Sequence, residues 1–236
     1  MSTQHLLHPE LHPILKAVPP FQFRRDNLEN FRNARASAAV LGDAGAAGVR
    51  REEVIIRSNS AIGGSYAMSC LLYTPEQSGP TGAYLHIHGG GYIGGRKEYS
   101  DHMNTQIASA LGVTVLAVGY RLAPEHPIPA PLDDCYAALA WLHDQSTNLG
   151  IDPARIAIGG ESAGGGLAAA LAIRARDEGK YPVCHQHLTY PMLDDRTGTP
   201  EHFGDPLVGE FVWNRQSNRF GWSCYLGEHP AQAPYV

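Results

Sequence analysis

The sequence predicts an α/β fold, in which a mostly parallel sheet is covered by helices on both faces. Short, almost wholly apolar runs such as VTVLAVGY (residues 113–120) are typical of strands that are buried on both sides. Longer segments with helical spacing of apolar residues alternate with these runs. The chain has 236 residues, which is enough to bury a sizeable core.

The N-terminal third is less regular than the rest. Four prolines in residues 1–21 predict short, broken helical pieces, and residues 28–41 have the apolar spacing of a helix. A glycine-rich break follows. Residues 54–58 and 66–74 then predict two strands, with a turn at Gly63 and Gly64 between them.

The central part alternates strands and helices. Strands are predicted at 83–91, 113–120, 155–160 and 185–191, and helices at 132–145 and 163–179. The first of these helices opens with two aspartates, which suit the positive end of its dipole. Residues 203–226 break the alternation and predict an excursion away from the sheet. Their aromatic residues are Phe203, Phe211, Trp213, Phe220, Trp222 and Tyr225.

Charge, apolar runs and cysteines exclude several classes of function. The 18 Lys and Arg against 23 Asp and Glu give a net charge of −5, so no nucleic-acid partner is expected. The longest apolar runs are too short to cross a bilayer, so no membrane partner is expected. The cysteines are far apart and form no CxxC pair, which argues against a zinc site. We expect a cytoplasmic protein with buried free thiols at Cys70, Cys135, Cys184 and Cys224.

A candidate nucleophile, Ser162, lies between a predicted strand and a predicted helix. Residues 160–164 fit G-x-S-x-G, in which small neighbours allow strand and helix to pass close to a strained serine. The alternative interpretation is a serine that only caps the helix. Glu161 is expected to support this turn, although an acid beside the nucleophile could instead tune a nearby histidine.

The segment HIHGGGY (residues 86–92) follows another predicted strand. Its glycines leave backbone N–H groups unobstructed, as the stabilisation of a tetrahedral oxyanion requires. A flexible turn or a phosphate loop are the alternatives, but the chain has no GxxxxGK[ST] motif. His88 begins the loop, so we expect it to anchor the loop rather than to act as a base.

Three motifs in order resemble the hormone-sensitive-lipase-like carboxylesterases of the α/β-hydrolase fold: HGGGY, YRLAPEHPIPAPLDD and GGESAGGGLA. YPMLDDR and WNRQSN…GWSCYLG extend the resemblance over nearly the whole chain. It implies N-terminal cap helices at 1–45, a hydrolase core at 46–202, a cap insert at 203–226 and the start of a further part at 227–236. It also implies a serine esterase or lipase that needs no cofactor and cleaves small esters with short to medium acyl chains.

The same resemblance assigns roles to individual residues. Ser162 is the expected nucleophile, with oxyanion donors at Gly90, Gly91 and Ala163 and supporting residues at His88, Gly89 and Glu161. In YRLAPEHPIPA, the prolines are expected to stiffen the turn, and Arg121, Glu125 and His126 to pair with one another and brace it. The aromatic residues of the insert could form an acyl-binding wall or only the cap's own core.

The pattern breaks at the catalytic base. The family's triad Asp and His lie in DPLRDE-like and HGF-like stretches after the next strand, and neither stretch is present before the chain stops at APYV. His202 and Asp205 echo these motifs, but too early and in the wrong order. Asp194 or Asp195 could supply an acid, although a structural turn is the simpler interpretation. The C-terminal strands are therefore expected to be missing, with residues 185–191 at an exposed sheet edge.

Three explanations stay open at this stage. The chain could be a fragment of an esterase, a short form completed by another chain or by an unusual base, or a non-catalytic relative that binds a ligand. A homo-oligomer or pairing through the sheet edge would fit the second. An unassisted serine is a weak nucleophile, so esterase activity of this chain depends on a base that the sequence does not identify. Lactonase, amidase or thioesterase chemistry would use the same nucleophile.

Overall fold

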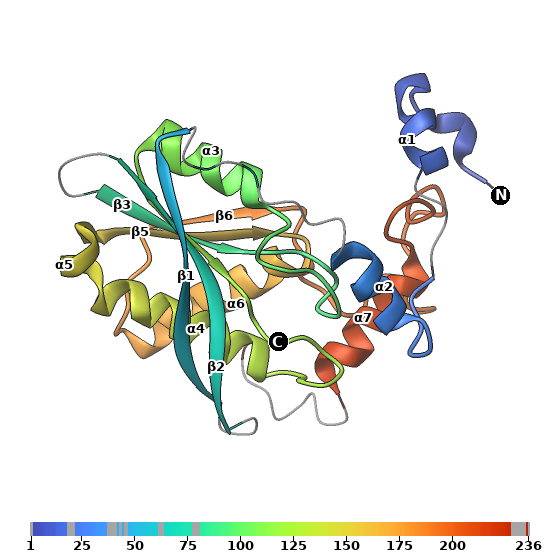
Figure 1. Cartoon of the computed structure of the whole chain (residues 1–236). Helices are drawn as coiled ribbons and strands as arrows, with labels where there is room; N and C mark the ends of the chain where they lie inside the picture. The colour runs from blue at the N-terminus through green and yellow to red at the C-terminus, as the bar shows by residue number, and fades with distance from the viewer. Residues whose placement is uncertain are drawn as a thin grey trace.

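The computed structural model describes residues 2–17, 22–36, 42, 44, 47–60, 64–76, 81–227 and 235. Within them, a six-stranded sheet has the strand order β1-β2-β4-β3-β5-β6 (Figure 1). The strands are β1 (Val49–Ser60), β2 (Gly64–Pro75), β3 (Thr81–Ile87), β4 (Thr114–Val118), β5 (Ile151–Glu161) and β6 (His185–Thr189). The pairs β1–β2 and β2–β4 are antiparallel, and the other pairs are parallel.

The centre of the sheet is β3, which pairs with β4 on one side and β5 on the other. Leu85 is in register with Leu116 and with Ile158. Because these strands are parallel, their carboxyl ends meet at the same edge of the sheet, where His88 follows β3 and Ser162 follows β5. The topology therefore brings the two motifs of the sequence together.

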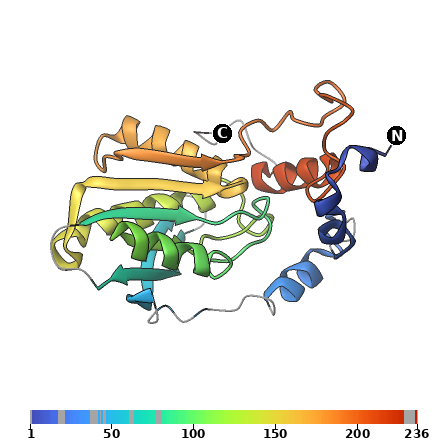
Figure 2. The ribbon, with the colours of Figure 1, turned by 90° about the horizontal axis from the view of Figure 1, so that it is seen from above.

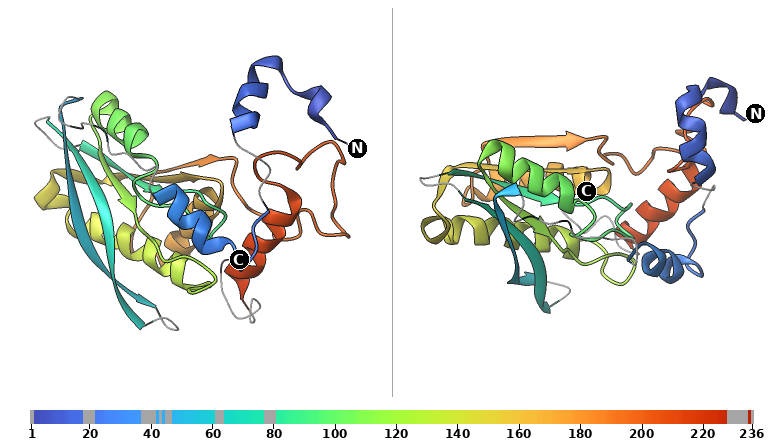
Figure 3. Two further views of the ribbon diagram at one scale, coloured as in Figure 1. Left: turned by 45° about the vertical axis from the view of Figure 1, so that its right-hand side comes forward. Right: turned by 45° about the horizontal axis from the view of Figure 1, so that its top comes forward.

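Helices cover both faces of the sheet and one of its ends. The α-helices are α1 (His12–Ala17), α2 (Leu28–Ala36), α3 (Asp101–Leu111), α4 (Ala130–Asp144), α5 (Ser146–Leu149), α6 (Ala163–Glu178) and α7 (Arg215–Leu226), preceded by the 3-10 turns η1 (Gln4–Leu6) and η2 (Pro9–Leu11). Helix α3 lies on one face, and α4 and α6 lie on the other (Figure 1). Helices α1, α2 and α7 lie at the end toward which β5 and β6 run (Figures 2 and 3).

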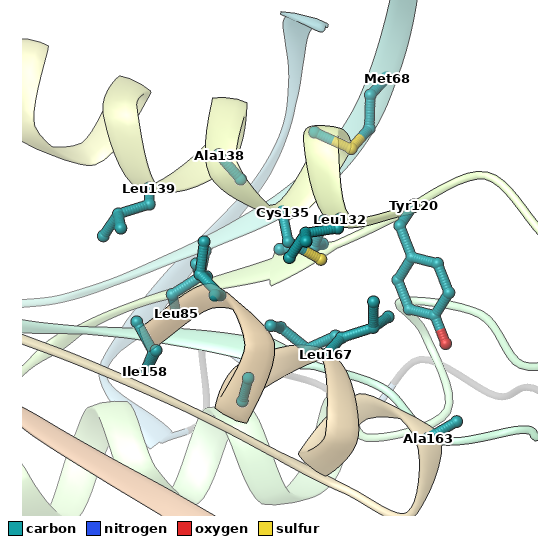
Figure 4. Packing of buried hydrophobic residues seen from close by; sticks show 14 of the residues in the cluster. Met68, Leu85, Tyr120, Leu132, Cys135, Ala138, Leu139, Ile158, Ala163 and Leu167 are labelled. Atoms are coloured by element: carbon teal, nitrogen blue, oxygen red, sulfur yellow. The ribbon is translucent and has the colours of Figure 1, made fainter. Parts of the chain in front are cut away.

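Alternation of apolar side chains along the strands builds a core on each face. On β4, Leu116 and Val118 belong to the larger cluster with residues of α4 and α6, whereas Val115 and Ala117 pack with Ala108 of α3. Figure 4 shows side chains of α4 and α6 meeting those of the strands, such as Leu85 and Ile158. The near-continuous apolar run in β4 follows from this burial on both faces.

The predicted fold class is confirmed, and the predicted strands correspond to β1 to β6. The sequence interpretation missed α3, whose buried residues include the polar Asp101, Asn104 and Thr105 and so weaken its apolar pattern. The helix expected at 28–41 is α2 as far as Ala36, and residues 37–41 and Gly63 lie outside the described residues. Among the described residues, no helix is long and apolar enough to span a membrane.

The expectation of four buried thiols is wrong for one cysteine. Cys70, Cys135 and Cys224 are buried and free, but Cys184 is free and exposed. The reason is its position: Cys184 directly precedes β6, and β6 is the last strand of the described sheet, where His185 to His187 are also exposed.

Candidate active site

Ser162 occupies a strained turn between β5 and α6. Its φ and ψ are 56° and −120°, a backbone conformation that is costly for a residue with a β-carbon. The turn is fixed by two backbone hydrogen bonds: Ser162 N donates to Thr189 O (2.9 Å), and Met192 N donates to Ser162 O (3.0 Å). The segment that follows β6 therefore holds the serine in place.

The glycines around Ser162 are required by packing. A β-carbon at Gly160 would come within 2.2 Å of Ile87 O, and one at Gly164 within 2.0 Å of the same atom. These contacts show how closely β3, β5 and the first turn of α6 approach one another. Small residues at both positions are therefore the physical basis of the G-x-S-x-G pattern here.

The hydroxyl of Ser162 is half-buried and makes no hydrogen bond to another described residue. Nothing in this part of the chain orients or accepts its proton. The site therefore has a candidate nucleophile whose activation is not built from the described residues.

The glycine loop after β3 lies against this turn. A β-carbon at Gly89 would lie 3.4 Å from Ser162 Cβ. Gly90 and Gly91 have φ values of +133° and +62°, which favour glycine. Gly90 O accepts from Ile93 N (3.2 Å) and Gly94 N (2.9 Å), which closes the loop into a turn.

Three backbone donors near the serine are unused within the described part of the chain. The N–H groups of Gly90, Gly91 and Ala163 donate to no described group, whereas Gly89 N donates to Glu161 Oε1 (3.3 Å). Ala163 is the first residue of α6, so its N–H also lies at the positive end of the helix dipole. Free donors of this kind can bind an anionic oxygen.

His88 anchors the loop by stacking and hydrogen bonding. Its ring stacks on Tyr120 at 4.2 Å between centroids, Nδ1 donates to Gly89 O (2.8 Å), and Tyr120 Oη donates to His88 O (2.9 Å). Burial lowers the pKa of His88 to about 4, so the ring is neutral at neutral pH.

Glu161 contacts the loop rather than the serine. One carboxylate oxygen accepts from Gly89 N and from Ser100 Oγ (3.2 Å), and the other lies 2.9 Å from His86 Nε2. Burial opposes its ionisation, but the hydrogen bonds from His86, Gly89 and Ser100 prevail and lower the pKa of Glu161.

The structure does not bring the alternative acids and bases of the sequence to Ser162 by any hydrogen bond. His202 is exposed, and its backbone bonds to the 198–199 turn. Asp194 is half-buried and binds Arg196, which lowers the pKa of Asp194 to about 2. Asp195 is one of the residues that line a surface hollow with Phe23 and Trp222, and Ser162 does not line that hollow.

The expected pairing of Arg121 with Glu125 and His126 is wrong. Arg121 instead forms a buried ion pair with Asp134 (2.7 Å), which lies near the start of α4. Glu125 pairs with Arg32 of α2 (2.8 Å). The segment is thus braced by partners outside it.

Two side chains connect α2 and α7 to the loop: Arg32, which the sequence interpretation did not single out, and Tyr225, one of the aromatic residues of the insert. Arg32 Nε donates to Ile93 O (2.7 Å), and its Nη2 donates to Ala123 O (2.8 Å). Tyr225 of α7 stacks on Tyr92 at 4.0 Å between centroids. No sequence signal marks Arg32, since it lies in a helix with several other charged residues.

Residues 84–236 match a protein family described as having the alpha/beta hydrolase fold. Over its full length the chain is also similar to the structure of a bacterial heroin esterase, with 38% identity, a TM-score of 0.85 and 74% of that chain covered. The chain belongs to the hormone-sensitive-lipase-like carboxylesterase family. The chain is likewise similar to the structure of a hyperthermophilic esterase from the archaeon Pyrobaculum calidifontis, with 32% identity and a TM-score of 0.79 over 97% of this chain and 74% of that one.

Curated relatives match this chain over a shorter segment. Esterase LipI of Mycobacterium tuberculosis is 45% identical over 107 residues, which are 45% of this chain and 33% of the relative. Ethyl acetate hydrolase of Pseudomonas putida is 42% identical over 128 residues, which are 52% of this chain and 40% of the relative. The matched segment thus spans two fifths or less of the length of these relatives.

Proposed function

We propose that the protein is a serine carboxylesterase that hydrolyses small esters with short to medium acyl chains. The observation that carries the proposal is the strained Ser162 beside the unused N–H groups of Gly90, Gly91 and Ala163. Relatives named as esterases and as an ethyl acetate hydrolase support it.

In the proposed reaction, Ser162 Oγ attacks the ester carbonyl carbon while its proton passes to a base. The carbonyl oxygen becomes an oxyanion, which accepts hydrogen bonds from Gly90, Gly91 and Ala163. Return of the proton to the alcohol oxygen breaks the ester bond and leaves an acyl-enzyme on Ser162. Water then repeats the sequence and releases the acid. No cofactor is needed in this scheme.

The base is the undecided part of the proposal. Among the described residues no histidine is hydrogen-bonded to Ser162. This observation favours a second candidate function: binding of a small ester-like ligand without turnover. By precedent, oxyanion donors and binding alone leave about 10³-fold acceleration over the reaction in water.

Hydrolysis of p-nitrophenyl butyrate by the chain, compared with Ser162→Ala, tests the proposal. Turnover that disappears in the variant supports an esterase and shows that a base exists in the protein or its assembly. Equal rates in both proteins exclude turnover at Ser162. Labelling by a fluorophosphonate provides a second readout, since only an activated serine reacts quickly, and a panel of lactones, amides and thioesters defines the acyl substrate.

Three further features belong to the same proposal. We propose that residues 1–45 and 203–226 form a cap over the core, which the position of α2 and α7 at the carboxyl end of the strands supports.

We propose a cytoplasmic location, for which free Cys70, Cys135, Cys184 and Cys224 argue. Pairing through the edge of β6 is the proposed route to a homo-oligomer, and analytical ultracentrifugation over a range of concentrations tests it.

A further inference from the structure

A network of polar side chains, in which His86 and Asn104 are buried and Glu161 is half-buried, lies beside the glycine loop. Glu161 Oε2 is 2.9 Å from His86 Nε2, and His86 Nδ1 is 3.2 Å from Asn104 Nδ2. His86 is 1% exposed and Asn104 is fully buried. Because His86 and Asn104 are buried, the hydrogen bonds that they make are costly to lose.

The contact with Asn104 fixes which ring nitrogen of His86 carries the proton. The amide nitrogen of Asn104 can only donate, so His86 Nδ1 accepts and His86 Nε2–H donates to Glu161. This leaves Asn104 Oδ1 buried without a hydrogen bond in the described structure.

The far end of this network is held by another residue of α3 and by two further strands. The Asn104 amide also interacts with the Tyr73 hydroxyl of β2, which donates to Asp101 Oδ1 of α3 at 2.9 Å. Asp101 forms an ion pair with Arg51 of β1 at 2.9 Å. The position of His86 is thus fixed by contacts that reach across the α3 face of the sheet.

At the other end of this network, Glu161 forms a hydrogen bond with Gly89, the first glycine of the loop. With Oε2 held by His86, Glu161 Oε1 accepts from Gly89 N (3.3 Å) and Ser100 Oγ (3.2 Å). Both carboxylate oxygens of Glu161 are therefore used by donors, which argues against Glu161 as the base for its neighbour Ser162. Gly89 N faces Glu161, while the next two N–H groups stay free of described partners.

We propose that Glu161 and His86 are positioning residues that fix the glycine loop relative to Ser162. Glu161, next to the nucleophile, forms a hydrogen bond with the loop that carries the oxyanion donors. Its carboxylate therefore sets the distance between Ser162 and that loop. The catalytic meaning of this arrangement rests on the proposed esterase function. The positioning itself is independent of turnover and can be measured without it.

Hydrogen exchange of the full chain under native conditions tests the proposal. The reporters are the amides of Ile93 and Gly94, which bond to Gly90 O and so follow the shape of the loop. In Glu161→Ala we expect exchange at these amides to be about ten-fold faster, because a charge-assisted hydrogen bond is removed. Glu161→Gln keeps an acceptor for Gly89 N but places its NH2 group against His86 Nε2–H, so it is expected to restore only part of the protection. Glu178→Gln, a change at an exposed ion pair of α6, is the matched control and should leave the loop unchanged.

A merely structural role of Glu161 predicts a different result. Faster exchange spread evenly over all strands, or none at Ile93 and Gly94, would overturn the positioning role. The His86→Phe variant repeats the test if Glu161→Ala does not fold, with the same expected loop-specific change. For Ser162-dependent hydrolysis, Glu161→Ala should lower kcat about ten- to hundred-fold with little change in KM. Absence of hydrolysis in the unmodified chain would count against the esterase proposal alone, since the exchange result stands without it.

Discussion

The indole ring of Trp213 lies directly against the backbone of Gly91. A β-carbon at Gly91 would come within 2.1 Å of Trp213 Cη2, a distance that no side chain can occupy. The ring is itself held by a hydrogen bond from Nε1 to Asn218 Oδ1 (3.0 Å) and by packing on Phe23 at 5.2 Å between centroids. The segment before α7 therefore forms a wall on the glycine loop.

Gly91→Ala should destabilise the protein by more than backbone strain explains. The positive φ of Gly91 costs an alanine roughly 1–2 kcal/mol, and the clash with Trp213 adds about 1–3 kcal/mol. Gly179→Ala is the matched control, because Gly179 has φ +64° and nothing within 4 Å of its built β-carbon. Urea unfolding of both variants measures the difference, and equal losses would show that Trp213 moves away freely.

Loss of Arg32 should free α2 from the loop. Its guanidinium donates to Ile93 O, Ala123 O and both oxygens of Glu125, and few of these acceptors have another described partner. We expect thermolysin to cleave within residues 22–36 about ten-fold faster in Arg32→Gln, since such bonds contribute on the order of 1–3 kcal/mol. Arg24→Gln, at an exposed ion pair with Asp26, should cleave at the original rate. If both variants behave alike, Arg32 does not hold the helix.

Acid should destabilise the protein through His88. An unfolded His88 binds its proton near pH 6.5, whereas burial lowers the pKa of the folded residue to about 4. Between these values the unfolded state binds more protons, so stability falls as the pH falls through this range. The full effect corresponds to about 3 kcal/mol. Urea midpoints at pH 7 and pH 5 should therefore differ less in His88→Gln than in the unmodified chain, and parallel pH dependences would contradict this.

One thiol should react in the native protein. Cys184 is exposed, whereas burial raises the pKa of Cys70 to about 12 and that of Cys135 well above its usual value. At pH 8 we expect an aromatic disulfide reagent to modify a single cysteine quickly, and all of them in denaturant. Cys184→Ser should abolish the fast phase. A fast phase that persists in this variant would mean that a buried thiol becomes accessible.

Much of the fold could be predicted because its central strands are buried on both faces and therefore read as continuous apolar runs. β4 (Thr114–Val118) lies within the predicted strand 113–120, and the predicted strand 155–160 lies within β5. Helix α3 was missed because it carries the buried polar residues Asp101 and Asn104, whose partners come from distant strands. The spacing of apolar residues carries no information about hydrogen-bond partners that only the folded chain brings together.

The candidate site likewise contains residues that the sequence marks and residues that it does not. Ser162 and the glycine loop have local signals, since a strained turn and a close backbone approach each require small residues at fixed spacing. Arg32 and Asn104 have none, because each acts through contacts with residues far away in the sequence. His86 begins the segment HIHGGGY, but the sequence analysis assigned a role only to His88.

The φ of +56° at Ser162 has a consequence for how this protein evolves. Glycine at this position would relieve the strain that a β-carbon imposes, so the nucleophile is retained at the expense of folding stability. Selection for stability alone would therefore favour glycine over serine at residue 162. In a lineage released from selection for turnover, this serine should be among the first residues of the site to disappear.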